Sequence, residues 1–126
     1  MSQETVRRIA VTSEGPSLSD AVDPRFGRAA GFVVVELESM GTTYVDNSAS
    51  QVLAQGAGIQ AAENLVKAGA EVLLTGFVGP KAFAALQAAG VKVVQGLEAL
   101  TVGEAIARFR AGDLSYAEAP NREGHA

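Results

Sequence analysis

The stretch EVLLTGFVGPKAFAALQAAGVKVVQ, residues 71–95, decides the fold. Residues 71–75 are typical of a buried strand. Pro80 suits the first position of a helix, and Gly90 suits its end, so a helix is expected over 80–89. Residues 91–95 then predict a second strand. A helical crossover returns the chain to the edge from which it started, so the two strands run parallel. We therefore expect an α/β protein.

The remaining elements follow from the same patterns on either side of this unit. Short turns upstream favour an antiparallel run of strands, and the T-V-G-E capping box at Thr101 favours a helix after it. Together they give the order βββαβαβα in a single domain over residues 1–115, followed by a polar tail at 116–126 that we expect to be disordered. The expected additional strands are 8–12, 32–38 and 42–46, and the expected additional helices are 56–68 and 102–111.

Composition excludes several classes of protein. Of the 126 residues, 48% are hydrophobic, so a core is available. No run reaches the roughly 18 apolar residues of a membrane span, and the N-terminus lacks the apolar segment of a secretion signal. We therefore expect a cytoplasmic protein that does not associate with a membrane.

Charge and side-chain chemistry also limit the ligands and the reactions that the protein could support. A net charge of −4 argues against nucleic-acid binding but permits a small cationic pocket. The chain has no cysteine, and His125 is its one histidine. Disulfides, thiolate-bound metals and triads built on histidine are therefore not expected.

Strand direction predicts where the loops meet. If strands 8–12 and 71–75 are parallel neighbours, their carboxyl ends lie at one edge of the sheet, together with the start of strand 32–38. The loops 13–31, 47–55 and 76–80 then converge on that edge with the first turns of two helices. Open α/β sheets bind ligands at this edge.

The residues on this edge favour an anion. Helix N-termini offer unpaired N–H groups and about half a positive charge each. Arg25 and Arg28 lie in the first loop, Lys81 opens a helix, and Phe26 could anchor the loop or wall a pocket. Glycines at positions 56, 58, 76 and 79 would let a ligand approach the backbone closely.

Each motif also has a purely structural interpretation. The segment 23–28, DPRFGR, could be a turn pinned by an ion pair between Asp23 and an arginine. The segment 55–58, QGAG, could be a helix start that packs closely on the sheet; it lacks the Gly-Lys-Ser/Thr ending of a P-loop. The segment 75–80, TGFVGP, could be a plain turn. Asp20 and Asp23 are weak candidates for metal ligands.

Four segments together resemble the dinitrogenase iron-molybdenum cofactor biosynthesis family: DPRFGR at 23–28, GAGIQAA at 56–62, TGFVGPKAF at 75–83 and LQAAGVKV at 86–93. The resemblance implies a ribonuclease H-like α/β fold, here a five-stranded mixed sheet flanked by three helices. It also implies that the protein binds or carries preformed metal–sulfur clusters, such as a molybdenum–copper sulfide or an iron–molybdenum cofactor. Such clusters are anionic. The apo form of the protein would contain no cluster.

The chain departs from this family at one position of interest. Many relatives carry a histidine where this chain has Gln55, and some carry cysteines. Binding through backbone amides and basic side chains is therefore expected in place of direct ligation. The expected cofactor-binding residues are Asp23, Arg25, Phe26, Gly27, Arg28, Gln55, Gly56, Ala57, Gly58, Gly76, Phe77, Val78, Gly79, Pro80 and Lys81, with no catalytic residue and no direct metal ligand.

Three functions remain open from the sequence. The first is a non-catalytic cluster carrier with a protein donor or acceptor of the cluster. The second is a nuclease, which would need carboxylates on central strands to hold divalent metals; the strands offer Glu36, Glu38, Asp46 and Glu71. The third is a regulatory or interaction module that binds a small phosphate-type anion or a protein partner.

Overall fold

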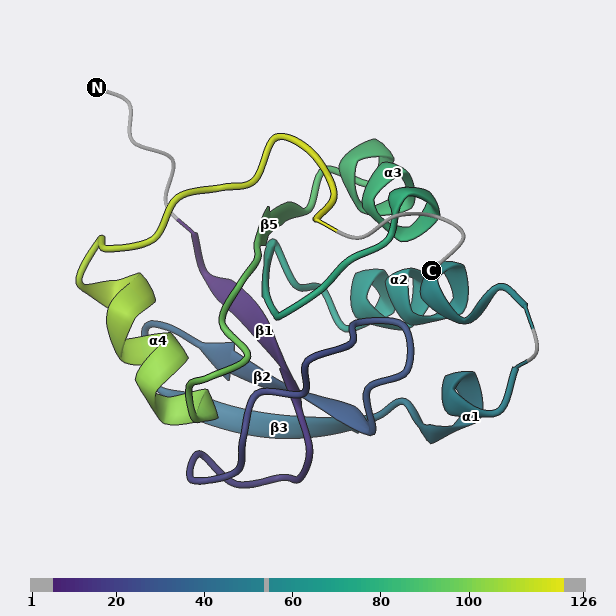
Figure 1. The fold of residues 1–126 in the computed structure, drawn as a ribbon. Helices are drawn as coiled ribbons and strands as arrows, with labels where there is room; N and C mark the ends of the chain where they lie inside the picture. The colour runs from purple at the N-terminus through teal and green to yellow at the C-terminus, as the bar shows by residue number, and fades with distance from the viewer. Residues whose placement is uncertain (1–5, 54, 122–126) are drawn as a thin grey trace.

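Five strands form one mixed sheet in the order β3-β2-β1-β4-β5 (Figure 1). The structure is a computed structural model that describes residues 6–53 and 55–121. Across those two ranges, no helix has both the length and the apolar character that a membrane span needs. The strands are β1 (Arg8–Ser13), β2 (Gly31–Glu36), β3 (Gly41–Asp46), β4 (Val72–Leu74) and β5 (Lys92–Val94), and the helices are α1 (Ser48–Gln51), α2 (Ala57–Lys67), α3 (Pro80–Ala88) and α4 (Val102–Arg110).

The pairing of the strands confirms the predicted topology. β1 lies antiparallel to β2 and parallel to β4, with Val11 opposite Val33 on one side and Leu74 on the other. β4 is parallel to β5, and β2 is antiparallel to β3. The carboxyl ends of β1, β3, β4 and β5 therefore lie at one edge of the sheet, which we call the carboxyl edge.

The prediction of three helices was wrong, because the loop after β3 contains the short helix α1. Its single turn is held by Asn47, whose carbonyl accepts a hydrogen bond from Ser50 N at 2.9 Å. The buried Asn47 side chain also accepts from Ser50 Oγ and donates to Ala29 O. A four-residue helix has no hydrophobic period, so the sequence pattern could not reveal it.

Helices cover both faces of the sheet, and this explains the continuous apolar run of β2. Phe32 and Val34 pack with α2 and α3, whereas Val33 and Val35 pack on the opposite face with α4. Figure 1 shows α4 on one side of the sheet and α2 with α3 on the other. Strands that are buried on both faces lose the alternation of apolar and polar residues.

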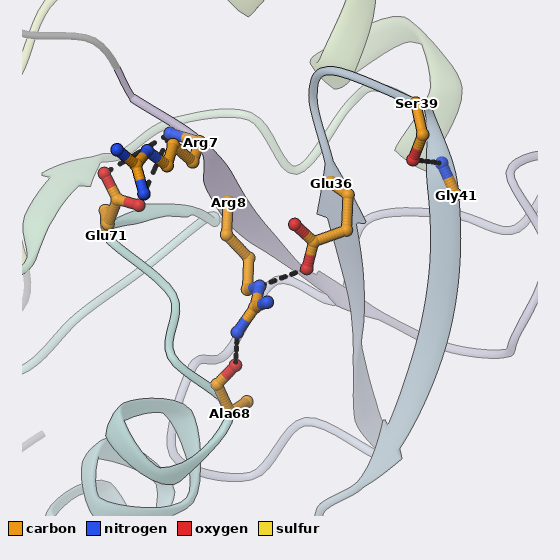
Figure 2. Close-up of polar contacts among 7 residues, drawn as sticks. All are labelled: Arg7, Arg8, Glu36, Ser39, Gly41, Ala68 and Glu71. Atoms are coloured by element: carbon orange, nitrogen blue, oxygen red, sulfur yellow. Dashed lines mark hydrogen bonds and ion pairs between the residues drawn. The ribbon is translucent and has the colours of Figure 1, made fainter.

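Arg8 ties the opposite edge of the sheet together (Figure 2). Its guanidinium forms an ion pair with Glu36 of β2 and donates a hydrogen bond from Nη1 to Ala68 O at 3.0 Å. Ala68 is the C-cap residue of α2. The same side chain therefore links two strands to the C-terminus of a helix, where a positive charge is favourable.

The segment that follows α4 runs alongside β5. Ala117 N donates to Val93 O at 2.7 Å, and Gln95 Nε2 donates to Ala119 O at 3.1 Å. The expected disordered tail began at residue 116, so these contacts fall within it. Residues 122–126 lie outside the described residues.

Candidate functional site

The segment 23–28 is held to the sheet by Asp23 and Phe26. Asp23 is buried; its N–H donates to Thr12 O at 2.9 Å, and its carboxylate accepts from Arg25 N and Ala30 N at 3.2 and 3.3 Å. The Phe26 side chain is 1% exposed and stacks on Phe32 with a centroid distance of 5.9 Å. Asp23 therefore organises the turn, and Phe26 anchors it in the core.

This segment pairs directly with the loop that follows β4. Phe77 N donates to Pro24 O at 2.6 Å, and Phe26 N donates to Phe77 O at 3.1 Å, which makes a short parallel bridge. A β-carbon on Gly76 would come within 2.6 Å of Pro24 O. Glycine is thus required at position 76 because the two loops are in contact.

Small residues bring the third segment, the start of α2, into the same cluster. A β-carbon on Gly27 would lie 2.9 Å from Gly58 Cα, and one on Gly58 would lie 2.9 Å from the Ala82 side chain. The loop after β1, the first turn of α2 and the first turn of α3 are therefore in contact. The convergence predicted from strand direction is seen in the structure.

The three segments enclose a cleft of about 400 Å³ at the carboxyl edge. Such a volume falls within the range of small-molecule sites, about 300–1,000 Å³. We call this feature the rim cleft. It is lined by Arg25, Phe26, Gly27, Arg28, Gln55, Gly56, Ala57, Gly58, Phe77, Gly79, Pro80, Lys81 and Ala82.

Both helices that begin at the rim cleft start without a side-chain cap. Gly56 and Gly79 are the N-cap residues of α2 and α3, and neither first turn contains an acidic residue. In contrast, α4 starts with a complete capping box between Thr101 and Glu104. The first N–H groups of α2 and α3 have no carbonyl partner within their own helix and are therefore available to an acceptor in the cleft.

Three cationic side chains line the rim cleft, and none of the described residues lining it is acidic. Arg25 and Lys81 are exposed, and the structure shows no ion pair for either within the described residues. Arg28 is held in place: its Nη1 donates to Gln51 O and Leu53 O at 2.9 and 3.0 Å. The cleft is therefore positive in a chain whose net charge is −4.

The structure separates the predicted site residues into two groups. Asp23, Gly76 and Val78 do not line the rim cleft, whereas the other predicted residues do. The glycines that were expected to let a ligand approach the backbone, at positions 56, 58, 76 and 79, also differ in role. Gly58 makes a close contact between α2 and α3, and Gly76 makes one between two loops, while a β-carbon on Gly56 or Gly79 would meet nothing within 4 Å. Close approach of a ligand to the backbone is thus possible at Gly56 and Gly79.

Two features of the site were missed from the sequence. Ala82 lines the cleft in the first turn of α3, and counting residues from Pro80 could have identified it. The carbonyls of Gln51 and Leu53 hold Arg28, and Gln51 Nε2 donates back to Arg28 O at 3.1 Å. No local pattern indicates that contact, since the partners are 23 and 25 residues apart.

The donors of the rim cleft suit an anion better than a bare metal ion. Within residues 6–53 and 55–121, no group of three or more His, Cys, Asp or Glu side chains could hold a metal. Asp20 and Asp23 use their carboxylates on backbone N–H groups. The Asp23–arginine ion pair of the alternative, purely structural interpretation is not found among the described residues. His125 lies outside the described residues. N–H groups and cations, by contrast, bind oxygen or sulfur atoms that carry negative charge.

Comparison with known proteins identifies relatives over almost the whole chain. Residues 6–112 match the family described as "Dinitrogenase iron-molybdenum cofactor". The apo form of the orange protein from Desulfovibrio gigas is 62% identical with a TM-score of 0.92, and the match covers 95% of this chain and 100% of that one.

Two further solved structures share the fold. A NifB-like protein from Thermotoga is 39% identical with a TM-score of 0.73, covering 87% of this chain and 92% of its own. The protein PH0822 is 24% identical with a TM-score of 0.71, covering 88% and 96%, which shows the fold alone. A search of the curated proteins found no match.

Proposed function

The chain belongs to the dinitrogenase iron-molybdenum cofactor family, and from that premise we propose that it is a non-catalytic carrier of an anionic metal–sulfur cluster. The cluster is the cargo of the protein, of the molybdenum–copper sulfide or iron–molybdenum type, and the rim cleft is where it binds. A protein that donates or accepts the cluster completes the role.

The observation that supports this proposal most directly is the charge of the rim cleft. Arg25, Arg28 and Lys81 line it together with two uncapped helix N-termini, and no described lining residue is acidic. Acidic residues outnumber basic ones in the chain by 14 to 10, so this concentration of positive charge is local. A multiply charged anion is the ligand that such a site stabilises.

Binding would rest on hydrogen bonds to the outside of the cluster. The first residues of α2 and α3 line the cleft, and a hydrogen bond from a backbone N–H to a charged acceptor contributes about 1.5–3 kcal/mol. Gln55 also lines the cleft and supplies an amide donor at the position where a histidine was expected from relatives. Phe77 provides an apolar wall that excludes water from the donors.

The strand carboxylates support a carrier over a nuclease. Glu36 pairs with Arg8 at the edge opposite the rim cleft, and Glu71 accepts hydrogen bonds from Arg7 N at that same edge (Figure 2). Asp46 accepts from Ser48 N and Oγ. These carboxylates are used in separate contacts, so they are not arranged around a common divalent ion.

The proposal can be tested by reconstitution. The purified protein is incubated with tetrathiomolybdate and copper, desalted, and examined by visible absorption and metal analysis. We expect a chromophore that stays with the protein in a fixed metal-to-protein ratio. Loss of all colour on desalting would contradict the proposal.

A phosphate-type ligand is the competing outcome of the same experiment. Thermal shifts are measured with tetrathiomolybdate, inorganic phosphate and nucleotides at equal ionic strength. A carrier is stabilised most by the thiomolybdate mixture. A larger shift with phosphate or a nucleotide, and no retained chromophore, would identify a regulatory module in its place.

A further inference from the structure

Residues 115–121, which we call the C-terminal strap, lie outside the family match, which ends at residue 112, and cross the molecule to the loop that follows β4. The strap begins beside α4, follows β5 and reaches the carboxyl edge (Figure 1). Ala117 N donates to Val93 O. Gln95 fixes the far part of the strap, because its Nε2 donates to Ala119 O at 3.1 Å and its Oε1 accepts from Asn121 N at 3.2 Å.

Asn121 joins the strap to the loop that follows β4. Its side-chain Oδ1 accepts from Val78 N at 2.9 Å, and its Nδ2 donates to Gly76 O at 3.0 Å. These two backbone groups lie on either side of Phe77, which lines the rim cleft. The single amide therefore fixes the backbone both before and after a wall residue of the cleft.

The geometry of the loop determines what this contact achieves. Val78 is 1% exposed and packs in the core, while Gly79 and Lys81, immediately after it, line the rim cleft. Any movement at Val78 would displace the N-terminus of α3 and the Phe77 wall together. Donors that stay fixed bind an anion more tightly than donors that must be reordered on binding.

We propose that Asn121 is a positioning residue for the rim cleft and that the C-terminal strap controls how long an anion stays bound. The inference rests on the proposed function for the identity of the ligand. The effect of the strap on the 76–80 loop does not depend on that function. Without the strap, the 76–80 loop samples open states from which the ligand leaves faster. The strap thereby sets retention without contacting the ligand.

The effect on the loop is tested first on the ligand-free protein. Hydrogen exchange is measured at Val78 N–H in the wild type, Asn121→Ala and Gln95→Ala. Both variants are expected to exchange about tenfold faster at Val78, a change that corresponds to roughly 1.4 kcal/mol. Asn121→Ala removes both hydrogen bonds to the loop, and Gln95→Ala removes the two that fix the strap. Ser115→Ala, at an exposed strap residue with no hydrogen bond within the described residues, serves as the matched control. Unchanged exchange at Val78 in Asn121→Ala would overturn the proposal.

The effect on retention is tested with the tetrathiomolybdate–copper probe. Asn121→Ala and Gln95→Ala should each release the probe several-fold faster than Ser115→Ala, and the double variant no faster than either alone, since both act through one strap. Faster release that merely follows a lower Tm, or additive effects, would indicate general destabilisation and overturn the positioning role. If the wild type retains no probe, the carrier proposal fails, and the exchange experiment alone decides whether the strap holds the loop.

Discussion

Gly27 lies against Gly58 so closely that a β-carbon on Gly27 would come within 2.9 Å of both Gly58 Cα and Gly58 N. The contact joins the loop that carries both rim-cleft arginines to the first turn of α2. The atoms on the far side are backbone atoms, which cannot rotate away as a side chain would. The distance between this loop and the first turn of α2 therefore depends on Gly27 having no β-carbon.

Gly27→Ala is expected to lower the free energy of unfolding by about 1–3 kcal/mol, because overpacking forces the backbone to shift. It should also weaken anion binding, since Arg25 and Arg28 move with the loop. Chemical denaturation measures the first effect. The control is Gly41→Ala, where the new carbon meets only the Ser39 side chain at 3.3 Å and the expected change is within about 0.5 kcal/mol. Equal stabilities for the two variants would contradict this prediction.

Removing the exposed cations of the rim cleft should weaken anion binding without affecting folding. Arg25→Gln and Lys81→Gln are each expected to raise the dissociation constant about tenfold, corresponding to one lost charge-assisted contact. Titration calorimetry with tetrathiomolybdate measures the change, and the salt dependence should become shallower in the double variant. Arg108→Gln, on α4, removes the same charge from the other face of the sheet and should leave the affinity unchanged. An equal loss in that control would mean that net charge, rather than the cleft, attracts the anion.

Arg8→Ala should affect stability but not binding. The side chain joins Glu36 to Ala68 at the edge opposite the rim cleft. Because the Arg8 and Glu36 side chains are 39% and 43% exposed, the ion pair itself contributes no more than about 1 kcal/mol. Thermal unfolding and anion titration of the same preparation separate the two effects. A loss of affinity at unchanged stability would show that the two edges of the sheet communicate.

Tyr44 provides a pH-dependent signal near the carboxyl edge. Burial raises the pKa of the Tyr44 phenol above its ordinary value of 10.0, and the Asp46, Asp20 and Asp23 carboxylates raise it further. The folded state therefore holds the phenol proton more tightly than the unfolded state. Its contribution to stability is complete below about pH 10 and is lost as the pH rises through the folded pKa.

Ultraviolet titration of a Tyr116→Phe variant isolates the Tyr44 phenol, since the chain has two tyrosines. The midpoint should lie above that of free tyrosine. Tyr44→Phe should remove the part of the alkaline destabilisation that begins near pH 10. A midpoint at or below 10.0 would contradict the assigned burial and charge environment.

Local patterns predicted most elements of this fold. Each strand and helix of the unit over 71–95 was indicated by its own short stretch of residues. The same is true of β2, with its apolar run, and of α4, with its capping box at Thr101. The structure confirms these elements. The place of β1 beside β4 was assumed, and the strand pairing confirms it. Given that assumption, the strand directions followed from connection length and the parallel crossover, which are general rules of chain geometry. Since those rules place loops as well as strands, the meeting of three segments at one edge could be predicted too.

The roles of individual residues within that edge could not be predicted in the same way. Arg28 was expected to face a ligand, but its Nη1 holds the carbonyls of Gln51 and Leu53. Gly58 was expected to open the backbone to a ligand, but it packs against Gly27 and Ala82. Both outcomes depend on which backbone comes to lie within a few ångströms, and this is settled only when the loops pack.

The sequence alone determined the order of the strands and of the three longer helices, the edge at which the loops meet and the positive character of that edge. These depend on side-chain period, turn residues and strand direction, all of which act over short stretches of chain. The tertiary structure alone decided that Asn121 would hold Gly76 and Val78, residues 45 and 43 positions away. Hydrogen bonds at that separation form because folding brings the groups together, so no local pattern of residues encodes them.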